Sequence, residues 1–577
     1  MGSGKGTRAP WLAVLLCLVL VAGACGGDDD DGAEAGSGEN TEEAEETETE
    51  TGDSQAAGGE ITEGGTLVFG ADQDFGGFNT GLSKNNQLAA SLVMRHIWSS
   101  GYRVRPDFTL EPWILAKEAE VVSEAPFTVE WTLRDNAMWS DGTPVTSSDM
   151  EFAALVCNGK NEEADCVSTS GYDLITKLTK PTDKTIRAEF SQVYSDYEGL
   201  MGTFPSHIIK RDFGEGIANM VKGWNEGFQD SPGASNGPFT LATRERGVSL
   251  TLERNDTFWG SKPHLDRIIF RFLPDSGSQI TALDNAEVDM INPQPQLDQV
   301  STVEEMADVN SIIGFGPTFE HLTFNFENEF LAIPEVRQAI ALGVDRQAIV
   351  NRLMKPFSEK ASTLGNRIIV STQAGYEAHG QEYARADVEK AQALLEEAGF
   401  EKSGTYYEKD GKELELRLST TAGNALRERQ GVFIQAQLKR IGINIRIDNS
   451  SPPDLFNKRL PDGDFDIANF AWVGSVFPAP AVKQIYGTGS DSNYSNYSNP
   501  RVDELGLKAL ATVDETEKLA VLNQIDELLW EGLPNLPLYQ KPTFLAYSEK
   551  FANIEDNTTN ESPFWNSEEW AVRARAQ

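Results

Sequence analysis

The sequence predicts an α/β protein of two or three domains. Segments of alternating apolar and polar residues, typical of strands, are interleaved with longer segments that have the periodicity of amphipathic helices. This order is typical of sheets covered by helices. The chain has 577 residues, and the part from residue 64 onward exceeds the ~250–300 residues that one hydrophobic core serves. Because no repeat with a period of about 20–50 residues is present, a solenoid or propeller is not expected.

Residues 1–24 have the features of a secretory signal peptide. Lys5 and Arg8 precede the apolar run Trp11 to Val21, which is shorter than the ~20 residues of a membrane-spanning helix. The Ala22-Gly23-Ala24-Cys25 junction resembles a bacterial lipobox, although Ala22 stands where Leu is usual. The resemblance implies that Cys25 becomes the lipid-modified first residue of a lipoprotein. The alternative is an ordinary secretory signal with an incidental Cys.

Residues 25–63 predict a disordered acidic tether. From Gly26 to Glu63 the chain has fifteen Asp and Glu residues, no Lys or Arg and no aromatic residue. Such a segment buries too little apolar surface to offset its chain entropy, and its charges repel one another. A flexible link between a membrane anchor and a folded body is therefore expected, with an acidic interaction tail as the alternative.

Charge and cysteine content restrict the partners and the compartment. The formal net charge is -40, and a chain this acidic repels nucleic acid and anionic lipid headgroups. Two cysteines remain in the body, Cys157 and Cys166. In an oxidising compartment this pair favours a disulfide over a metal or redox site, since neither His nor a Cys-x-x-Cys spacing accompanies it. We expect no metal and no cofactor, because the five His residues are scattered without ligand spacing.

The pattern along the body then predicts individual elements, with an irregular loop at residues 72–86. Asp141-Gly142 followed by Pro144 indicates a tight turn, after which Ser147 or Ser148 would cap a helix from 149 to 156. The predicted strands lie at 65–71, 127–133, 248–253, 267–273, 321–326, 414–419 and 444–447. The other predicted helices lie at 88–98, 334–354, 387–398, 425–441 and 515–530.

Six blocks along this body resemble, in order, the large extracytoplasmic solute-binding proteins of ABC importers, the type that binds oligopeptides, dipeptides or nickel. The N-terminal blocks are Trp131-Thr132-Leu133-Arg134-Asp135 with Asp141-Gly142-Thr143-Pro144 and Asp149, and Asn236-Gly237-Pro238-Phe239 with Leu252-Glu253-Arg254-Asn255 and Phe258-Trp259. The central block is Phe324-Asn325 with Val336-Arg337-Gln338-Ala339-Ile340 and Asp345-Arg346. The C-terminal blocks are Ala391 to Gly399, Gly442-Ile443, and Asp464-Phe465-Asp466 with Trp472.

The resemblance implies a two-lobed periplasmic-binding-protein-like fold of type II, in its large three-domain variant, with a hinge and an interlobe cleft. Lobe I is expected from residues 64–100, 205–315 and 540–577. An extra domain is expected at 101–204 and lobe II at 316–539. A solute would shift the population toward a closed form that docks on a membrane permease coupled to an ATPase. The resemblance further implies a monomer, without catalytic activity, held by its lipid at the outer face of the bacterial cell membrane.

The same resemblance gives candidate ligand-binding residues. In peptide-binding relatives, main-chain groups beside the family Trp hold the ligand, and here they correspond to Ala471 and Val473 around Trp472. Those relatives carry an Asp for the peptide ammonium group where this chain has Ser475, so free-amine peptides are disfavoured and blocked peptides, sugars or other polar solutes are favoured. The remaining candidates, each with a packing role as the alternative, are Phe78, Asn79, Asn85, Asn86, Phe477, Tyr494 and Lys541.

Two motifs predict other functions and are given less weight. Gly233-Ala234-Ser235-Asn236-Gly237 matches the G-x-S-x-G pattern of hydrolases, but Pro232 and Pro238 flank it where a strand and a helix are needed. Asp462, Asp464 and Asp466 have the spacing at which a calcium loop begins, without its later Gly and Glu. A secreted hydrolase and a non-transport surface receptor or chaperone on the same fold remain the alternatives to a transport receptor.

Overall fold

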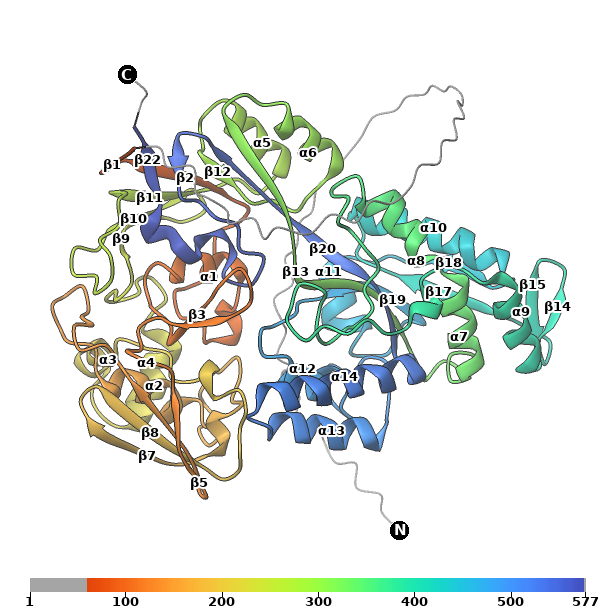
Figure 1. Ribbon diagram of the computed structural model, residues 1–577, viewed down its shortest axis with the longest axis horizontal. Coiled ribbons are helices and arrows are strands. Elements are labelled where there is room, and N and C mark those ends of the chain that lie inside the picture. Colours follow the sequence, from red (N-terminus) through yellow and green to blue (C-terminus); the bar gives the residue numbers. More distant parts are fainter. Residues whose placement is uncertain (1–59, 575–577) are drawn as a thin grey trace, which may run out of the picture.

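The computed structural model describes residues 60–574 and has two lobes joined by two long strands (Figure 1). These crossing strands are β13 (Val309–Phe324) and β20 (Asn535–Ser548), which pair antiparallel along most of their length. The predicted signal peptide, Cys25 and residues 25–59 of the predicted tether lie outside the described residues. Between residues 60 and 574, no helix has the length and apolar composition that crossing a bilayer requires.

One ten-stranded mixed sheet runs through both lobes, in the order β18-β17-β19-β13-β20-β12-β2-β11-β10-β9. In lobe I, β2 pairs in parallel with β11 and β12, while in lobe II β17 pairs in parallel with β18 and β19. The sheet therefore links the lobes without interruption. The lobe I strands are β2 (Thr66–Ala71), β9 (Phe239–Glu245), β10 (Ser249–Arg254), β11 (Arg267–Phe272) and β12 (Met290–Ile291). The lobe II strands are β17 (Glu415–Ser419), β18 (Asn444–Ile447) and β19 (Ile467–Trp472).

Helices cover the sheet and enclose a separate apolar core in each lobe. The core of lobe I includes Leu67, Phe69 and Phe270, and that of lobe II includes Ile340, Leu416 and Ile434. The lobe I helices are α1 (Leu88–Met94), α5 (Ser276–Asp284), α6 (Leu297–Glu304) and η7 (Ser562–Glu569), with η1 (Ser83–Asn85) in the loop after β2. The lobe II helices are α7 (Pro334–Gly343), α8 (Arg346–Ile349), η4 (Val350–Met354), η5 (Gln381–Tyr383), α9 (Val388–Glu397), α10 (Ala425–Arg440), α11 (Pro452–Asp454), η6 (Leu455–Arg459), α12 (Pro478–Tyr486), α13 (Pro500–Leu510) and α14 (Glu515–Gly532).

The extra domain is built on a four-stranded antiparallel sheet in the order β5-β6-β8-β7. Its core is a cluster that includes Trp131, Trp139 and Ile186. The elements are β3 (Tyr102–Val104), β4 (Leu110–Pro112), β5 (Glu120–Glu124), β6 (Phe127–Thr132), α2 (Ser147–Val156), η2 (Tyr172–Leu174), β7 (Ile175–Thr182), β8 (Thr185–Phe190) and η3 (Tyr197–Gly199), against which α3 (Ser206–Phe213) and α4 (Ile217–Glu226) pack. Cys157 and Cys166 form the predicted disulfide, with their Cα atoms 5.8 Å apart.

Three predicted boundaries are wrong, each for a local reason. The predicted tether extends too far, because Ile61–Thr62 form β1, which pairs with β22 (Ala571–Arg573); β21 (Phe551–Ala552) completes that sheet. The cap of α2 is Thr146 rather than Ser147 or Ser148, because Thr146 and Asp149 form a reciprocal capping box. The helix predicted at 334–354 is broken after Gly343: Val344 is extended, and the Asp345 side chain accepts from Ala348 N to cap a new helix.

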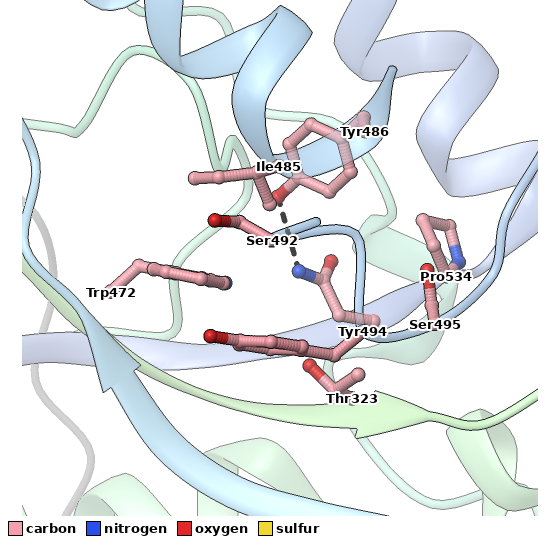
Figure 2. Close-up of a pocket in the computed structure, with 9 residues that line it drawn as sticks. Thr323, Trp472, Ile485, Tyr486, Ser492, Tyr494, Ser495 and Pro534 are labelled. Carbon is pink, nitrogen blue, oxygen red and sulfur yellow. Dashed lines mark hydrogen bonds between the residues drawn. The ribbon is translucent and has the colours of Figure 1, made fainter. Parts of the chain in front are cut away.

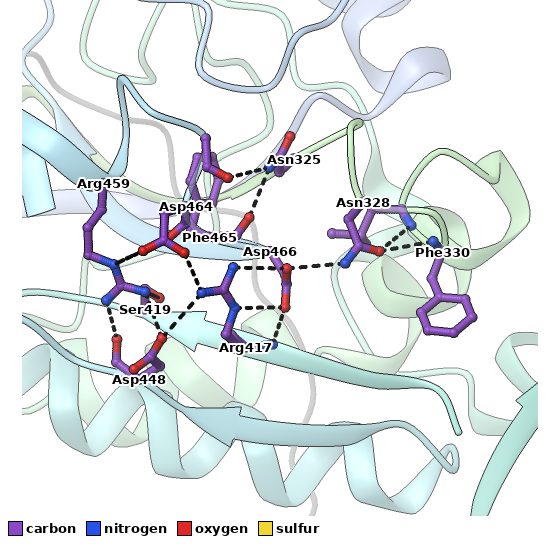
Figure 3. A network of polar contacts seen from close by, with 12 residues as sticks. Asn325, Asn328, Phe330, Arg417, Ser419, Asp448, Arg459, Asp464, Phe465 and Asp466 are labelled. Atoms are coloured by element: carbon purple, nitrogen blue, oxygen red, sulfur yellow. Dashed lines mark hydrogen bonds and ion pairs between the residues drawn. The ribbon is translucent and has the colours of Figure 1, made fainter. Parts of the chain in front are cut away.

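The Asp464-Phe465-Asp466 block stabilises lobe II through ion pairs (Figure 3). The Arg417 guanidinium donates to Asp464 Oδ1 at 2.7 Å, and the Arg417 backbone N donates to Asp466 Oδ2 at 2.7 Å. The hydrogen bond from Arg417 lowers the pKa of Asp464. Arginine side chains therefore pair with these carboxylates at the place where a calcium loop would hold its metal ion. Within residues 60–574, no group of three or more His, Cys, Asp or Glu residues is arranged to hold a metal ion. A small sheet of β14 (Glu401–Ser403), β15 (Tyr406–Lys409) and β16 (Lys412–Glu413) completes this lobe.

Candidate ligand-binding site

The end of β19 brings the predicted main-chain ligands against the crossing strands. Ala471 lies opposite Glu320 of β13, and Trp472 lies opposite Phe319. Just beyond, a Cβ placed on Gly474 would lie 2.4 Å from the carbonyl oxygen of Pro317. Only glycine permits this approach, so the chain at Val473 and Gly474 is held directly against β13 at the junction of the lobes.

The indole of Trp472 belongs to the core of lobe II rather than to an open surface. It is 8% exposed and lies parallel to the ring of Tyr494, with centroids 5.9 Å apart. The ring of His321 is also parallel to the indole, with centroids 6.0 Å apart. Figure 2 shows Trp472 and Tyr494 at the edge of a cavity of about 10 Å³, room for about one water molecule. The cavity is lined by Thr323, Trp472, Ile485, Tyr486, Ser492, Tyr494, Ser495, Pro534 and Asn535.

Three charged side chains gather on the lobe II side of this junction. Arg427 of α10 donates to both oxygens of Glu320, with Nε 3.1 Å from each and Nη2 2.9 Å from Oε1. Lys541 of β20 interacts electrostatically with both, yet among the described residues it has no carboxylate within ion-pair distance. Burial, reinforced by the positive charge of Arg427, lowers the pKa of Lys541 to about 8. Near neutral pH the three groups therefore carry a net charge of one positive unit.

Ser475 and Phe477 join the end of β19 to α12. The hydroxyl of Ser475 accepts a hydrogen bond from Phe477 N at 3.0 Å. The Phe477 ring lies against the extra domain, since a Cβ on Gly199 would be 3.3 Å from its Cε2 atom. Phe477 is thus placed between two domains, a contact that its sequence neighbours do not indicate.

The candidates in the first loop are mostly buried in lobe I. Phe78 and Asn79 are fully buried, and Asn85 is 1% exposed. The Asn79 amide donates to Trp224 O at 2.9 Å and accepts from Gly81 N at 3.0 Å. These side chains fix the loop, so the structure does not place them at a ligand-accessible surface; Asn86 is half-buried. The resemblance could not separate positions that shape the loop from positions that face the solute.

A second and larger cavity, of about 250 Å³, lies in lobe I beside the extra domain. It contains two ion pairs, Arg95 with Glu561 and Arg103 with Glu568. Aromatic rings form much of its wall. The lining residues are Thr80, Ser91, Met94, Arg95, Trp98, Ser99, Ser100, Arg103, Trp113, Gly202, Thr203, Phe204, Pro238, Glu561, Phe564, Trp565, Ser567 and Glu568.

This cavity reaches the crossing strands through the segment after β21. Thr558 Oγ1 donates to Phe315 O on β13 at 3.2 Å, and three residues later Glu561 lines the cavity. Gly316 of β13 is so close to this segment that a Cβ would lie 2.1 Å from Thr558 O. The cavity of lobe I and the charged group of lobe II therefore both adjoin the irregular middle of β13.

The hydrolase alternative lacks a usable nucleophile at its motif. Ser235 is fully buried, and its hydroxyl donates its one hydrogen to the carbonyl oxygen of either Ile97, at 2.7 Å, or Phe239, at 2.6 Å, while it accepts from Gly237 N at 3.2 Å. A buried hydroxyl engaged with main-chain groups in this way fixes a loop and is not presented to a substrate. The G-x-S-x-G match is therefore structural.

Sequence reasoning missed Glu320, Arg427 and the cavity residues of lobe I. A signal for Glu320 was present, because it is the one carboxylate in a strand end, Phe319 to Phe324, in which Phe319, Leu322 and Phe324 are apolar. A buried charge requires a partner, but the partner, Arg427, is 107 positions away in the chain. No local pattern indicates which of several arginines it is.

Comparisons with known proteins agree with this architecture. The family model for bacterial extracellular solute-binding proteins, family 5 Middle, matches residues 109–494. The oligopeptide-binding protein OppA of Mycobacterium tuberculosis is 28% identical over 504 residues, covering 86% of this chain and 83% of the relative. An uncharacterized lipoprotein of Mycobacterium leprae is 24% identical over 551 residues, with 88% and 94% covered.

Solved structures with the same fold include binding proteins for chemically different solutes. A periplasmic EDTA-binding protein, EppA, has a TM-score of 0.84 and 28% identity, with 90% of this chain and 98% of that chain covered. The oligopeptide-binding protein AppA of Bacillus subtilis, solved with a nonapeptide, has a TM-score of 0.71 and 21% identity, with 89% and 100% covered.

Proposed function

We propose, since this chain belongs to family 5 of the bacterial extracellular solute-binding proteins, that it captures a polar solute bearing an anionic group between its lobes. The family consists of extracytoplasmic receptors that deliver solutes to the permeases of ABC importers, and it is a family of binding proteins rather than enzymes. For this chain we propose binding without chemical change to the solute. Delivery would be to a permease whose paired ATPase drives import.

The observation that carries the proposal is the unpaired cation at the lobe junction. Lys541 lies beside the Glu320–Arg427 pair, and no carboxylate in the described part of the chain pairs with it. A solute carboxylate there would gain a charge-assisted hydrogen bond in a site shielded from water. Ser475 supports the same conclusion, because a hydroxyl provides no counter-charge for an ammonium group. A peptide with a blocked amine, or another organic acid, fits better than a free-amine peptide.

The rest of the proposed site uses main-chain and aromatic groups. Main-chain groups of Ala471 and Val473 would orient the solute on the lobe II side. On the lobe I side, the cavity of about 250 Å³ offers aromatic walls and paired charges. Pockets for small molecules are typically apolar with a few placed polar groups. This composition suits a solute with both an apolar body and polar ends. The EDTA-binding relative EppA is a precedent for an organic polyanion on this fold.

The test is isothermal titration calorimetry with EDTA, an N-acetylated tripeptide and the same tripeptide with a free amine. We expect tighter binding of the two probes that lack a free primary amine, EDTA because of its excess of carboxylates and the acetylated peptide because its amine is blocked. Lys541→Met should weaken their binding by roughly 10–100-fold, the equivalent of one charged hydrogen bond. Lys439→Met, which removes an exposed lysine at the end of α10, is the matched control and should change nothing. Unchanged affinity in Lys541→Met, or preference for the free amine, would refute the proposal.

The pH dependence provides a second readout. Because the pKa of Lys541 is about 8, its ammonium form is depleted as the pH rises through that value. Affinity for an anionic probe should therefore fall above pH 8 in the wild type and stay flat in Lys541→Met.

We propose that a lipid on Cys25 attaches the protein to the membrane. The tether that follows would end at residue 60, where β1 begins, and the protein would act as a monomer. The leprosy-bacillus relative that is named a lipoprotein supports the lipid. The proposed division into domains keeps lobe I at 64–100, 205–315 and 540–577, with β1 added, the extra domain at 101–204 and lobe II at 316–539.

A further inference from the structure

The extra domain contacts lobe II at a second place, away from the crossing strands. Ser195 N donates to Leu510 O, the last residue of α13, at 2.8 Å. Next to it, Asp196 Oδ1 lies 3.5 Å from Lys518 Nζ on α14. The Leu510 side chain packs against the core cluster of the extra domain. In Figure 1 the ends of α13 and α14 face this domain. We call the group of Ser195, Asp196, Leu510 and Lys518 the clasp.

The ion pair of the clasp is buried. The side chains of Lys518 and Asp196 are 7% and 2% exposed, so solvent screens their attraction weakly. Ser195 Oγ donates to Asp196 Oδ1 at 3.2 Å, while Asp196 Oδ2 is buried and has no hydrogen-bond partner among residues 60–574. Lys518 also lies 2.8 Å from Glu515. Lys518 is thus the cation that balances Asp196 across the domain boundary.

The carboxylates around Lys518 outnumber it. Glu198, on the extra domain, belongs to the same electrostatic group, and burial raises its pKa to about 6. Burial likewise raises the pKa of Asp196, against the lowering effect of Lys518. Without the ammonium group, Asp196 and Glu198 of the extra domain would face Glu515 of α14 across the boundary, and this repulsion would favour separation of the domains.

The needs of α14 itself do not explain a buried lysine at this position. Lys518 is in the first turn of the helix, where the helix dipole favours acidic residues, and Asp514, Glu515 and Glu517 are there as expected. The helix dipole disfavours a cation in this turn, and the pair with Glu515 at 2.8 Å within the helix offsets this cost without requiring the lysine to be buried. Its position makes sense through the contact with Asp196 on the other domain.

We propose that Lys518 is a positioning residue that holds the extra domain against lobe II and so raises the population of the closed conformation. The inference rests on the proposed function in that this closed conformation is the one that encloses the solute. The clasp touches none of the proposed solute-binding groups. It would act by making the binding-competent state more populated, which tightens the apparent affinity for every solute by the same factor.

The test is small-angle X-ray scattering of the full chain with no solute added. Lys518→Met leaves Asp196 buried and unpaired, which should lower the ratio of closed to open molecules at least about tenfold and enlarge the radius of gyration. Lys508→Met is the matched control, because Lys508 pairs with Glu517 at 2.8 Å within lobe II and both side chains are exposed; it should scatter as the wild type does. Circular dichroism verifies that each variant is folded.

A double variant separates the ion pair from a general packing defect. Asp196→Asn with Lys518→Met removes both charges, so the radius of gyration should return toward the wild-type value. Asp196→Asn alone tests the pair from the other domain and serves if Lys518→Met does not fold. A Lys518→Met protein as compact as the wild type, or a double variant as open as the single one, overturns the inference.

Titration with EDTA distinguishes this failure from failure of the proposed function. If the clasp holds, Lys518→Met binds EDTA more weakly while the pH dependence assigned to Lys541 is retained. A wild-type protein that ignores EDTA and both tripeptides, but opens when Lys518 is replaced, would refute the proposed solute class and leave the clasp standing.

Discussion

Replacing Trp472 by alanine should destabilise lobe II strongly. The indole is 8% exposed, is parallel to the rings of His321 and Tyr494, and has the Phe470 ring centroid at 5.2 Å. A buried aromatic side chain of this size removes 150–250 Å² from water, and truncation of such a residue to alanine costs about 3–5 kcal/mol. For a lobe of this size, that cost lowers the melting temperature by about 6–20 °C.

Differential scanning calorimetry measures this change. Val432→Ala is the control in the same lobe, because Val432 on α10 is 59% exposed, and its replacement should stay within about 0.5 kcal/mol. A loss below about 1 kcal/mol in Trp472→Ala would refute the reasoning. It would mean that the indole is not part of the packed core, and that a direct role in contacting solute has to be considered again.

Two further predictions concern pH and attachment. His379 Nδ1 lies 2.8 Å from Asp526 Oδ2, and this hydrogen bond raises the pKa of His379 above 6.5. The contribution of this hydrogen bond to the free energy of unfolding is therefore fully present below pH 6.5 and is lost as the pH rises through the raised pKa. Urea unfolding at several pH values measures this decline, which His379→Gln should abolish. A decline in His379→Gln equal to that of the wild type would contradict the assignment. Cys25→Ser should release the protein from the membrane fraction on centrifugation, and a variant that still sediments with membranes would exclude a lipid on Cys25.

Local sequence pattern was sufficient to predict the bounds of two regular elements that bury one face against the core. The strand predicted at 444–447 is β18 without change, and the helix predicted at 425–441 differs from α10 by one residue. In both, the periodicity of apolar residues and a cap or glycine at the end give the same answer as the tertiary contacts. Here local preference and packing agree.

The crossing strands were missed or shortened because their sequences contain strand-breaking residues. β20 includes Pro537 and Pro542, and β13 includes Gly314 and Gly316. Proline is tolerated within a sheet mainly at bulges and edges. Both prolines lie at irregularities of the β13–β20 register, where Pro542 faces Phe315 and Pro537 faces His321. The irregularity that accommodates them cannot be read from either strand alone.

The candidate site was predictable in position more than in side-chain role. The resemblance identified the end of β19 and Lys541, which the structure places at the junction of the lobes. It did not reveal that Trp472, Phe78 and Asn79 are buried, since burial depends on partners far away in the chain. The pair of Asp196 and Lys518 spans 322 positions, and nothing near either residue indicates the other.

The β1–β22 pair determines which part of the molecule is the stationary one. Ile61 pairs with Arg573, Gly64 N donates to His264 O at 2.8 Å, and Gly65 N donates to Asp266 Oδ2 at 3.0 Å. Both ends of the described chain are therefore fastened to lobe I, where β1 and β22 lie side by side in Figure 1. A restraint applied at residue 60 acts directly on lobe I, whereas it reaches lobe II through β13 and β20, through the clasp and through the contact of Phe477 with Gly199. When the chain is held at residue 60, lobe I stays in place and lobe II is the part that moves as the lobes open and close.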